Sequence, residues 1–177
     1  MSTTIRFETS RSGSLPSDAT RPPQWPHFSD TVLVSLLGSM YSSVRLLTVK
    51  VIATSERLTR LDLPAYDKLL GEHERELDLM IKEIEATAEA RSLHYLMVGV
   101  GQELLIARTP NLYDPTNTYD MFADLYVDNL VIASQLRASV RRASEAEDLP
   151  YAESCEKWLQ DTERRASFLL EACQGTD

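Results

Sequence analysis

Apolar residues recur every three or four positions along most of the chain, which is the spacing of an amphipathic helix. The clearest stripe follows Ser29-Asp30, whose side chains suit a helix N-cap, and it predicts a first helix from Asp30 to about Leu58. After a short break, a second and densely charged helix is predicted from about Pro64 to Arg91, because proline is tolerated in a first helical turn.

The second half of the chain predicts three further helices. Leu93–Ile106 is apolar enough for a short buried helix, and the breakers in Thr109–Asn117 predict a loop. Longer helices are predicted over Thr118–Glu145 and, after an acidic turn, from about Pro150 to Cys173. Four long helices with one long connection, between the second and the third, predict an all-α fold, a ferritin-like four-helix bundle with a short extra helix in that connection.

The N-terminal segment, residues 1–29, has a different pattern. It contains four prolines and no apolar periodicity, and its three arginines against two acids leave a charge of about +1. Such a charge releases few counterions from DNA, which favours a flexible or draping tail over a DNA-binding arm. We therefore expect a tail over residues 1–29 and one helical domain over residues 30–177.

Composition narrows the class of protein. The 177 residues are 43% hydrophobic but only 7% aromatic, with six glycines, which disfavours a β-sandwich or barrel. We find no apolar run of roughly 20 residues and no apolar stretch after the N-terminal arginines, so we expect a soluble cytoplasmic protein. Cys155 and Cys173 lie 18 positions apart without CxxC spacing, which predicts reduced thiols.

The net charge of −9, with an isoelectric point near 4.9, bears on partners. A chain with this charge is repelled by phosphate backbones and by anionic membrane surfaces. We expect neither nucleic acid nor a membrane as a partner.

One side of the second predicted helix is acidic. At about 100° per residue, five carboxylates fall between about 40° and 100° from Leu70, beside the predicted core stripe. Lys82 is the nearest cation. Two interpretations stay open: a binding strip for hard cations, or a solvated acidic face. This acidic strip consists of Asp67, Glu74, Asp78, Glu85 and Glu89.

Histidines do not complete a metal motif on this helix. His27 lies in the tail, His73 falls about 60° to the other side of the core centre, and His94 follows the helix. The Glu-x-x-His pair of di-iron bundles is therefore absent. Phosphate loops, nucleophile elbows and zinc spacings are absent as well.

Several segments resemble the Dps family, the mini-ferritins described as DNA-binding proteins from starved cells. Phe122-Ala-Asp-Leu-Tyr-Val-Asp-Asn129 and Asp161-Thr-Glu-Arg-Arg-Ala-Ser-Phe-Leu-Leu170 are similar to the family's last two helices. Leu63-Pro64-Ala65-Tyr66 resembles the step that opens its second helix. The gap-free continuation places Glu85 and Glu89 where the family has its Asp-x-x-x-Glu metal pair.

The resemblance implies a hollow dodecamer that oxidises Fe²⁺ at ferroxidase sites between paired subunits. Glu74 of one chain would then face Glu85 and Glu89 of its partner. However, the family's two site histidines correspond to Leu58 and Leu70, and its tryptophan to Thr59. Leucine cannot bind a metal.

Three outcomes stay open for this altered site. The three glutamates bind one metal weakly, the site recruits Asp67 or Asp78, or the site is inactive. Oxygen ligands alone would suit Fe²⁺, Mn²⁺ or Mg²⁺ with little selectivity, and no organic cofactor is implied.

The resemblance also implies acid-lined pores on threefold axes, near the turn between the last two helices. The matching residues are Glu147, Asp148 and Glu153. Three copies of each acid would attract cations, although acids at a helix start also serve as ordinary caps.

These features predict a homo-oligomeric cage that takes up, oxidises and stores iron and so protects against oxidative damage. The alternative is a non-catalytic Dps-like shell or interaction protein, in which Leu58 and Leu70 pack an interface. Twelve copies would carry about −108 charges without a lysine-rich tail, so we expect no stable binding of duplex DNA.

Overall fold

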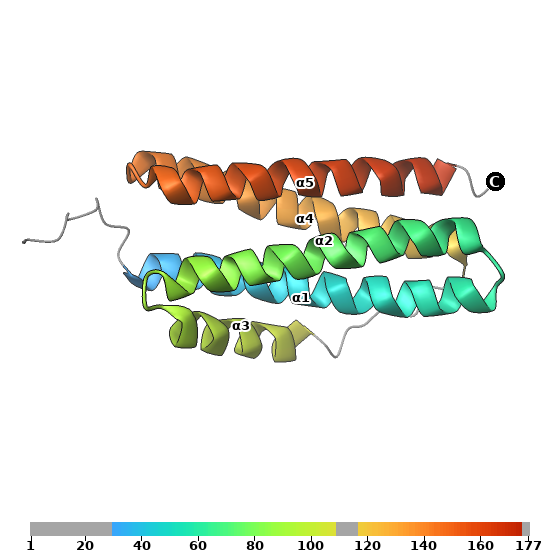
Figure 1. Ribbon diagram of the computed structural model, residues 1–177, viewed down its shortest axis with the longest axis horizontal. Coiled ribbons are helices and arrows are strands. Elements are labelled where there is room, and N and C mark those ends of the chain that lie inside the picture. The colour runs from blue at the N-terminus through green and yellow to red at the C-terminus, as the bar shows by residue number, and fades with distance from the viewer. Residues whose placement is uncertain (1–29, 109–116, 175–177) are drawn as a thin grey trace, which may run out of the picture.

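The computed structural model describes residues 30–108 and 117–174, which form five α-helices and no strand (Figure 1). The all-α prediction is confirmed, and every predicted helix end lies within two residues of the observed one. The predicted tail at 1–29 and most of the predicted loop, 109–116, lie outside the described residues. The helices are α1 (Asp30–Arg60), α2 (Pro64–Glu89), α3 (His94–Arg108), α4 (Thr118–Glu145) and α5 (Leu149–Gln174).

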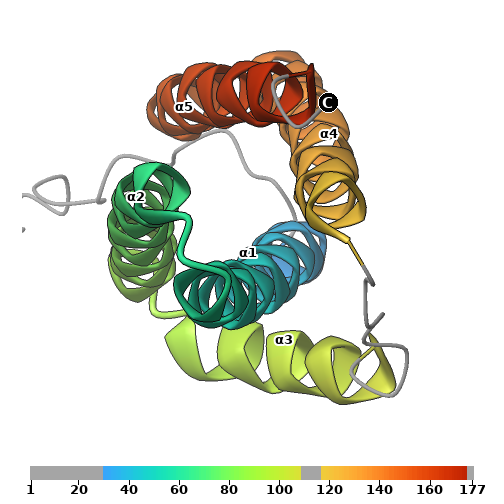
Figure 2. The ribbon, with the colours of Figure 1, turned by 90° about the vertical axis from the view of Figure 1, so that its right-hand side faces the viewer.

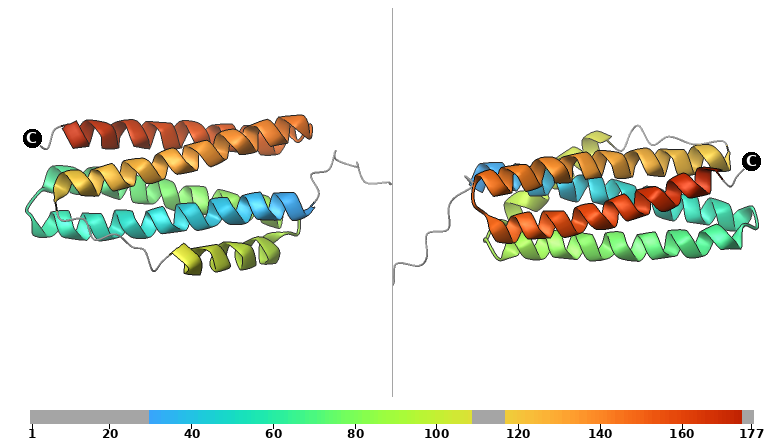
Figure 3. Two further views of the ribbon diagram at one scale, coloured as in Figure 1. Left: turned by 180° about the vertical axis from the view of Figure 1, so that it is seen from behind. Right: turned by 90° about the horizontal axis from the view of Figure 1, so that it is seen from above.

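The four long helices lie side by side, with α3 on the outer side of α1 (Figures 2 and 3). Helix α1 packs against α2, α3 and α4, whereas α5 packs mainly on α4 and makes a thinner seam with α2. Consecutive long helices within each half are antiparallel, but α2 and α4 run in the same direction (Figure 1). Helix α3 carries the chain back along α1 between them.

Two glycines set the close approach of α3 to α1. A Cβ atom on Gly38 would lie 2.9 Å from Val100 Cγ1, and one on Gly101 would lie 2.7 Å from Tyr41 Cδ1. Both distances are shorter than carbon atoms tolerate, so larger residues would push the two helices apart. The low helix propensity of Gly101 is outweighed by this contact.

The three short turns of the described chain share one geometry. Asp62, Ser92 and Glu147 adopt left-handed φ angles of 57°, 57° and 56°. In each turn, the residue after the left-handed one donates its backbone N–H to the carbonyl oxygen five positions before itself. In the turn at Ser92, for example, Leu93 N–H donates to Ala88 O at 2.8 Å. This is the Schellman ending of a helix, built here without glycine.

Helix α1 has a segment whose length and mean hydropathy would suffice to cross a membrane. The expectation that the chain has no apolar segment of about 20 residues therefore does not hold for α1. Of its apolar window, 61% is buried inside the protein. Cys155 and Cys173, both on α5, are buried and are not joined in a disulfide, which agrees with the prediction of reduced thiols.

Candidate functional site

The predicted acidic strip lies on α2, and four of its five carboxylates, those of Glu74, Asp78, Glu85 and Glu89, have no side-chain partner among the described residues. Glu74 and Glu85 are half-buried, whereas Asp78 and Glu89 are exposed. Within residues 30–108 and 117–174, no side chain donates a hydrogen bond or forms an ion pair to any of these four. Even Lys82, on the same helix, lies beyond ion-pair distance. The strip therefore keeps its negative charge without compensation from the described chain.

Asp67, at the start of the strip, is held by hydroxyl groups of α1. Its Oδ1 accepts hydrogen bonds from Ser55 Oγ at 2.6 Å and, more weakly, from Thr59 Oγ1 at 3.4 Å. These neutral donors join the end of α1 to the start of α2 and leave the carboxylate charge in place. One of them, Thr59, stands at the position where the resemblance expects tryptophan.

Leu58 and Leu70 are fully buried, with no exposed surface. Both side chains belong to the hydrophobic core rather than to the acidic strip. The two positions at which the resemblance expects histidine ligands therefore contribute packing energy here. A metal bound at the strip would depend on oxygen ligands.

The strip carboxylates do not converge within one chain. Among the described residues, no group of three or more histidine, cysteine or acidic side chains is close enough to hold a metal ion. Glu74 and Glu85 are separated by eleven residues, which is about 16 Å along a helix. A multidentate site made from these acids therefore needs carboxylates from a second chain.

The three acids near the α4–α5 turn differ in their surroundings. Asp148 is buried; it accepts from Arg91 at 2.7 and 2.8 Å and from the Tyr151 backbone N–H at 3.3 Å. It caps α5 and joins that turn to the end of α2, as the capping interpretation expects. Glu147 and Glu153 are exposed.

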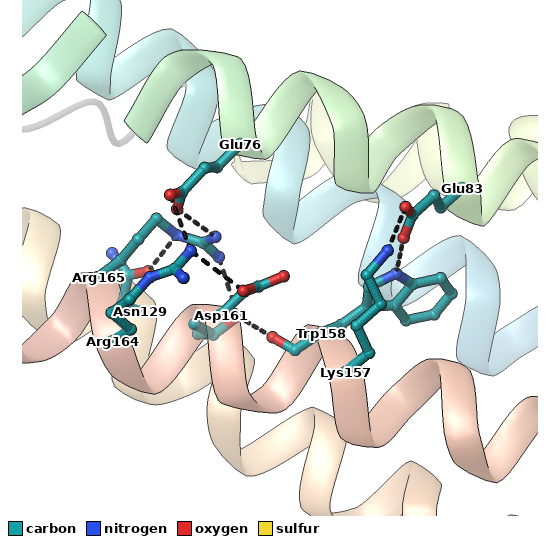
Figure 4. Close-up of polar contacts among 9 residues, drawn as sticks. Glu76, Glu83, Asn129, Lys157, Trp158, Asp161, Arg164 and Arg165 are labelled. Atoms are coloured by element: carbon teal, nitrogen blue, oxygen red, sulfur yellow. Dashed lines mark hydrogen bonds and ion pairs between the residues drawn. The ribbon is translucent and has the colours of Figure 1, made fainter. Parts of the chain in front are cut away.

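The opposite side of α2 carries a polar cluster that the sequence pattern did not single out (Figure 4). Glu76 accepts from Arg164 at 2.8 Å and from Arg165 at 3.4 Å, both on α5. One heptad later, Glu83 accepts from Lys157 and, at 2.7 Å, from the indole N–H of Trp158. Both acids and both cations are seven residues apart, Glu76 and Glu83 on α2 and Lys157 and Arg164 on α5. This shared spacing fits two antiparallel helices in contact. It could have been used on the sequence only if the pairing of α2 with α5 had been known.

Burial shifts the pKa values of groups along this seam. Burial lowers the pKa of Arg165, and Glu76 opposes that effect. Burial, together with the positive charges of Arg165 and Arg164, lowers the pKa of His73 to about 4. Burial acts to raise the pKa of Glu83, but hydrogen bonds from Lys157 and Trp158 hold it below its usual value. His73 is thus a neutral, buried imidazole beside two cations.

A second partly buried charge cluster joins α1 to α4. Lys50 Nζ lies 2.9 Å from Asp124 Oδ2 and 2.7 Å from Asp128 Oδ2. Burial acts to lower the pKa of this lysine, but the two aspartates raise it above its usual value. The Lys50 ammonium thus forms ion pairs with two carboxylates that lie one helical turn apart on α4.

No family model and no curated protein sequence matches this chain.

Proposed function

We propose that the chain is the subunit of a Dps-like mini-ferritin, a hollow homo-oligomeric cage that binds, oxidises and stores iron. The observation that carries the proposal is the contrast between the two acidic sides of α2. Glu76 and Glu83 are paired with basic residues of α5, whereas Glu74 and Glu85 are half-buried and unpaired among the described residues. A carboxylate that is partly removed from water without a partner is expected to take up a cation.

The helix order supports the same proposal. Helices α2 and α4 run in the same direction, and the connection between them contains α3 (Figure 1). This is the arrangement expected of a ferritin-like bundle with one long crossover.

The proposed metal site lies between two subunits. Glu74 of one chain would share an ion with Glu85 and Glu89 of another, since the three do not meet within one chain. Oxygen ligands suit Fe²⁺ and also Mn²⁺. Two Fe²⁺ ions would each give one electron to hydrogen peroxide, which takes up two protons and leaves as two waters. Dioxygen is the other oxidant to test.

The exposed Glu147 and Glu153 would attract cations to the entry pores. Asp148 would keep its structural contact with Arg91. The assembled cage would remain in the cytoplasm and, because of its acidic charge, bind neither DNA nor membranes.

The burial of Leu58 and Leu70 favours a second candidate, a Dps-like shell without ferroxidase activity. These leucines cannot hold iron, so the shell would owe its role to its assembly. The two candidates share the cage and differ in whether the acidic strip binds metal.

Crystals soaked in Fe²⁺ or Mn²⁺, with anomalous diffraction data, separate the candidates. We expect an anomalous peak between Glu74 of one chain and Glu85 or Glu89 of another. The Glu85→Gln/Glu89→Gln variant should lose that peak, and Glu72→Gln, an exposed acid of α2 outside the strip, should keep it. An empty strip, with iron oxidation no faster than without protein, would leave the shell. A light-scattering mass near 20 kDa would contradict both candidates.

A further inference from the structure

A cavity of about 210 Å³ lies in the thin seam between α2 and α5. The two charged clusters shown in Figure 4 bound its ends, and Leu79, Met80 and Trp158 form its apolar middle. Glu76 and Glu83 are one heptad apart, so the clusters are separated by about 10 Å along the helix. The cavity is smaller than the sites of drug-sized ligands, which span about 300–1,000 Å³, so it suits a smaller organic molecule.

The inner end of this cavity contains an incompletely neutralised cation. Arg165 is 1% exposed, and its closest carboxylate oxygen, on Glu76, is 3.4 Å away and belongs to a carboxylate shared with Arg164. Asp161 adds a negative charge beyond ion-pair distance, and it too is shared with Arg164. Asn129 and Thr162 accept two further N–H groups of Arg165. The described residues thus provide acceptors for three of its five N–H groups.

A buried imidazole lies beside the two arginines. His73 is 2% exposed, and neither of its ring nitrogens has a hydrogen-bond partner in the described chain. Burial, and after it the charges of Arg165 and Arg164, lower its pKa. Arg164 is half exposed, and its contacts with Glu76 and Asp161 can rearrange at small cost because exposed ion pairs contribute little. A planar anion could therefore approach both guanidinium groups.

We propose that the α2–α5 cavity binds a small monocarboxylate with an apolar body. The carboxylate would accept N–H groups of Arg164 and Arg165, since guanidinium matches carboxylate geometry. The apolar body would lie over Leu79, Met80 and Trp158. This site lies on the opposite side of α2 from the acidic strip and does not depend on metal binding.

The test follows the fluorescence of Trp158 in a Trp25→Phe background, which leaves it as the single tryptophan of the full chain. Sodium hexanoate should give a saturable change with a Kd on the order of 1 mM, as expected for a ligand of this size. Hexanamide and hexylammonium, at equal ionic strength, should each bind at least about tenfold more weakly because they lack the anion. Equal responses to all three compounds would overturn the proposal.

Three variants locate the binding. Arg164→Gln should weaken hexanoate binding about tenfold. Leu79→Phe should abolish it by filling the cavity from its exposed edge. Arg141→Gln, which removes another exposed cation on α4, should leave it unchanged. Because all three positions are exposed, the variants should fold, which circular dichroism verifies. Hexanoate binding that survives Leu79→Phe, or no saturation at 20-fold the expected Kd, would overturn the proposal.

Discussion

The two acidic sides of α2 are made from the same residue type on the same helix, yet they have opposite environments. On the α5 side, Glu76 and Glu83 each receive at least two donors from basic or indole groups. On the other side, Glu74 and Glu85 receive none from the described residues. The glutamates on both sides are half-buried, so burial does not explain the difference. The α5 side has hydrogen-bond donors within reach, and the described residues place none beside Glu74 and Glu85.

This difference separates carboxylates that join two helices from carboxylates that have no partner among the described residues. A paired acid lowers the free energy of the folded chain, and removing it leaves a cation without its partner. An unpaired acid makes no such contribution and repels its neighbours along the helix. We infer that the α5 side holds the bundle together, while the strip is the side left for an external cation or a second subunit.

The largest expected effect comes from Glu76→Gln. It leaves Arg165, which is almost fully buried, with no carboxylate within ion-pair distance among the described residues. Losing the partner of a buried charge costs about 3–5 kcal/mol, measurable by urea unfolding at pH 7. The double variant Glu76→Gln/Arg165→Met should regain part of this stability because the lone charge is gone. A loss below about 1 kcal/mol for Glu76→Gln would show that the α5 side is no different from the strip.

The second largest effect is a loss of stability in acid through His73. The pKa of its imidazole is about 4 in the folded chain, against a usual value of 6.5. Between these values the unfolded chain binds a proton that the folded chain does not, so stability is complete above pH 6.5 and decreases as the pH falls towards 4. The total loss is about 3 kcal/mol.

Comparison with His73→Leu isolates this effect from the titration of the carboxylates. Urea midpoints of both proteins at pH 7.5, 5.5 and 4.5 provide the measurement. The difference in unfolding free energy between wild type and variant should change with pH. Parallel curves would mean that another group is responsible for the acid sensitivity.

A smaller effect is expected from metal at the strip. If the assembled protein binds Mn²⁺ there, tenfold excess of the free ion over its Kd should stabilise it by about 1.4 kcal/mol. The Glu85→Gln/Glu89→Gln variant should not respond, and Glu72→Gln should respond as wild type does. Differential scanning calorimetry with and without Mn²⁺ measures the shift. An equal shift in all three proteins would place the ion elsewhere.

The sequence predicts the helices well because their apolar period of 3.6 residues is a local property. It also places the acidic strip on one side of α2, since rotation along a helix follows from numbering alone. The pairing of Glu76 with Arg164 depends on how α2 and α5 are offset, which no local pattern contains. The sequence also does not reveal the Schellman turns at Asp62, Ser92 and Glu147, because glycine, the usual residue at the left-handed position, is absent from them.

The smallest expected effect is that of Glu74→Gln in the metal-free protein. This substitution has the same shape as Glu76→Gln and lies only two residues away, but no described side chain pairs with Glu74. The stability should therefore change by less than about 0.5 kcal/mol, with a small gain where repulsion along the strip is relieved. Urea unfolding in a chelating buffer measures both variants under one condition. A loss for Glu74→Gln comparable to that for Glu76→Gln would mean that the strip glutamate has a structural partner, such as a cation of a second subunit, and the strip would then not be free for metal.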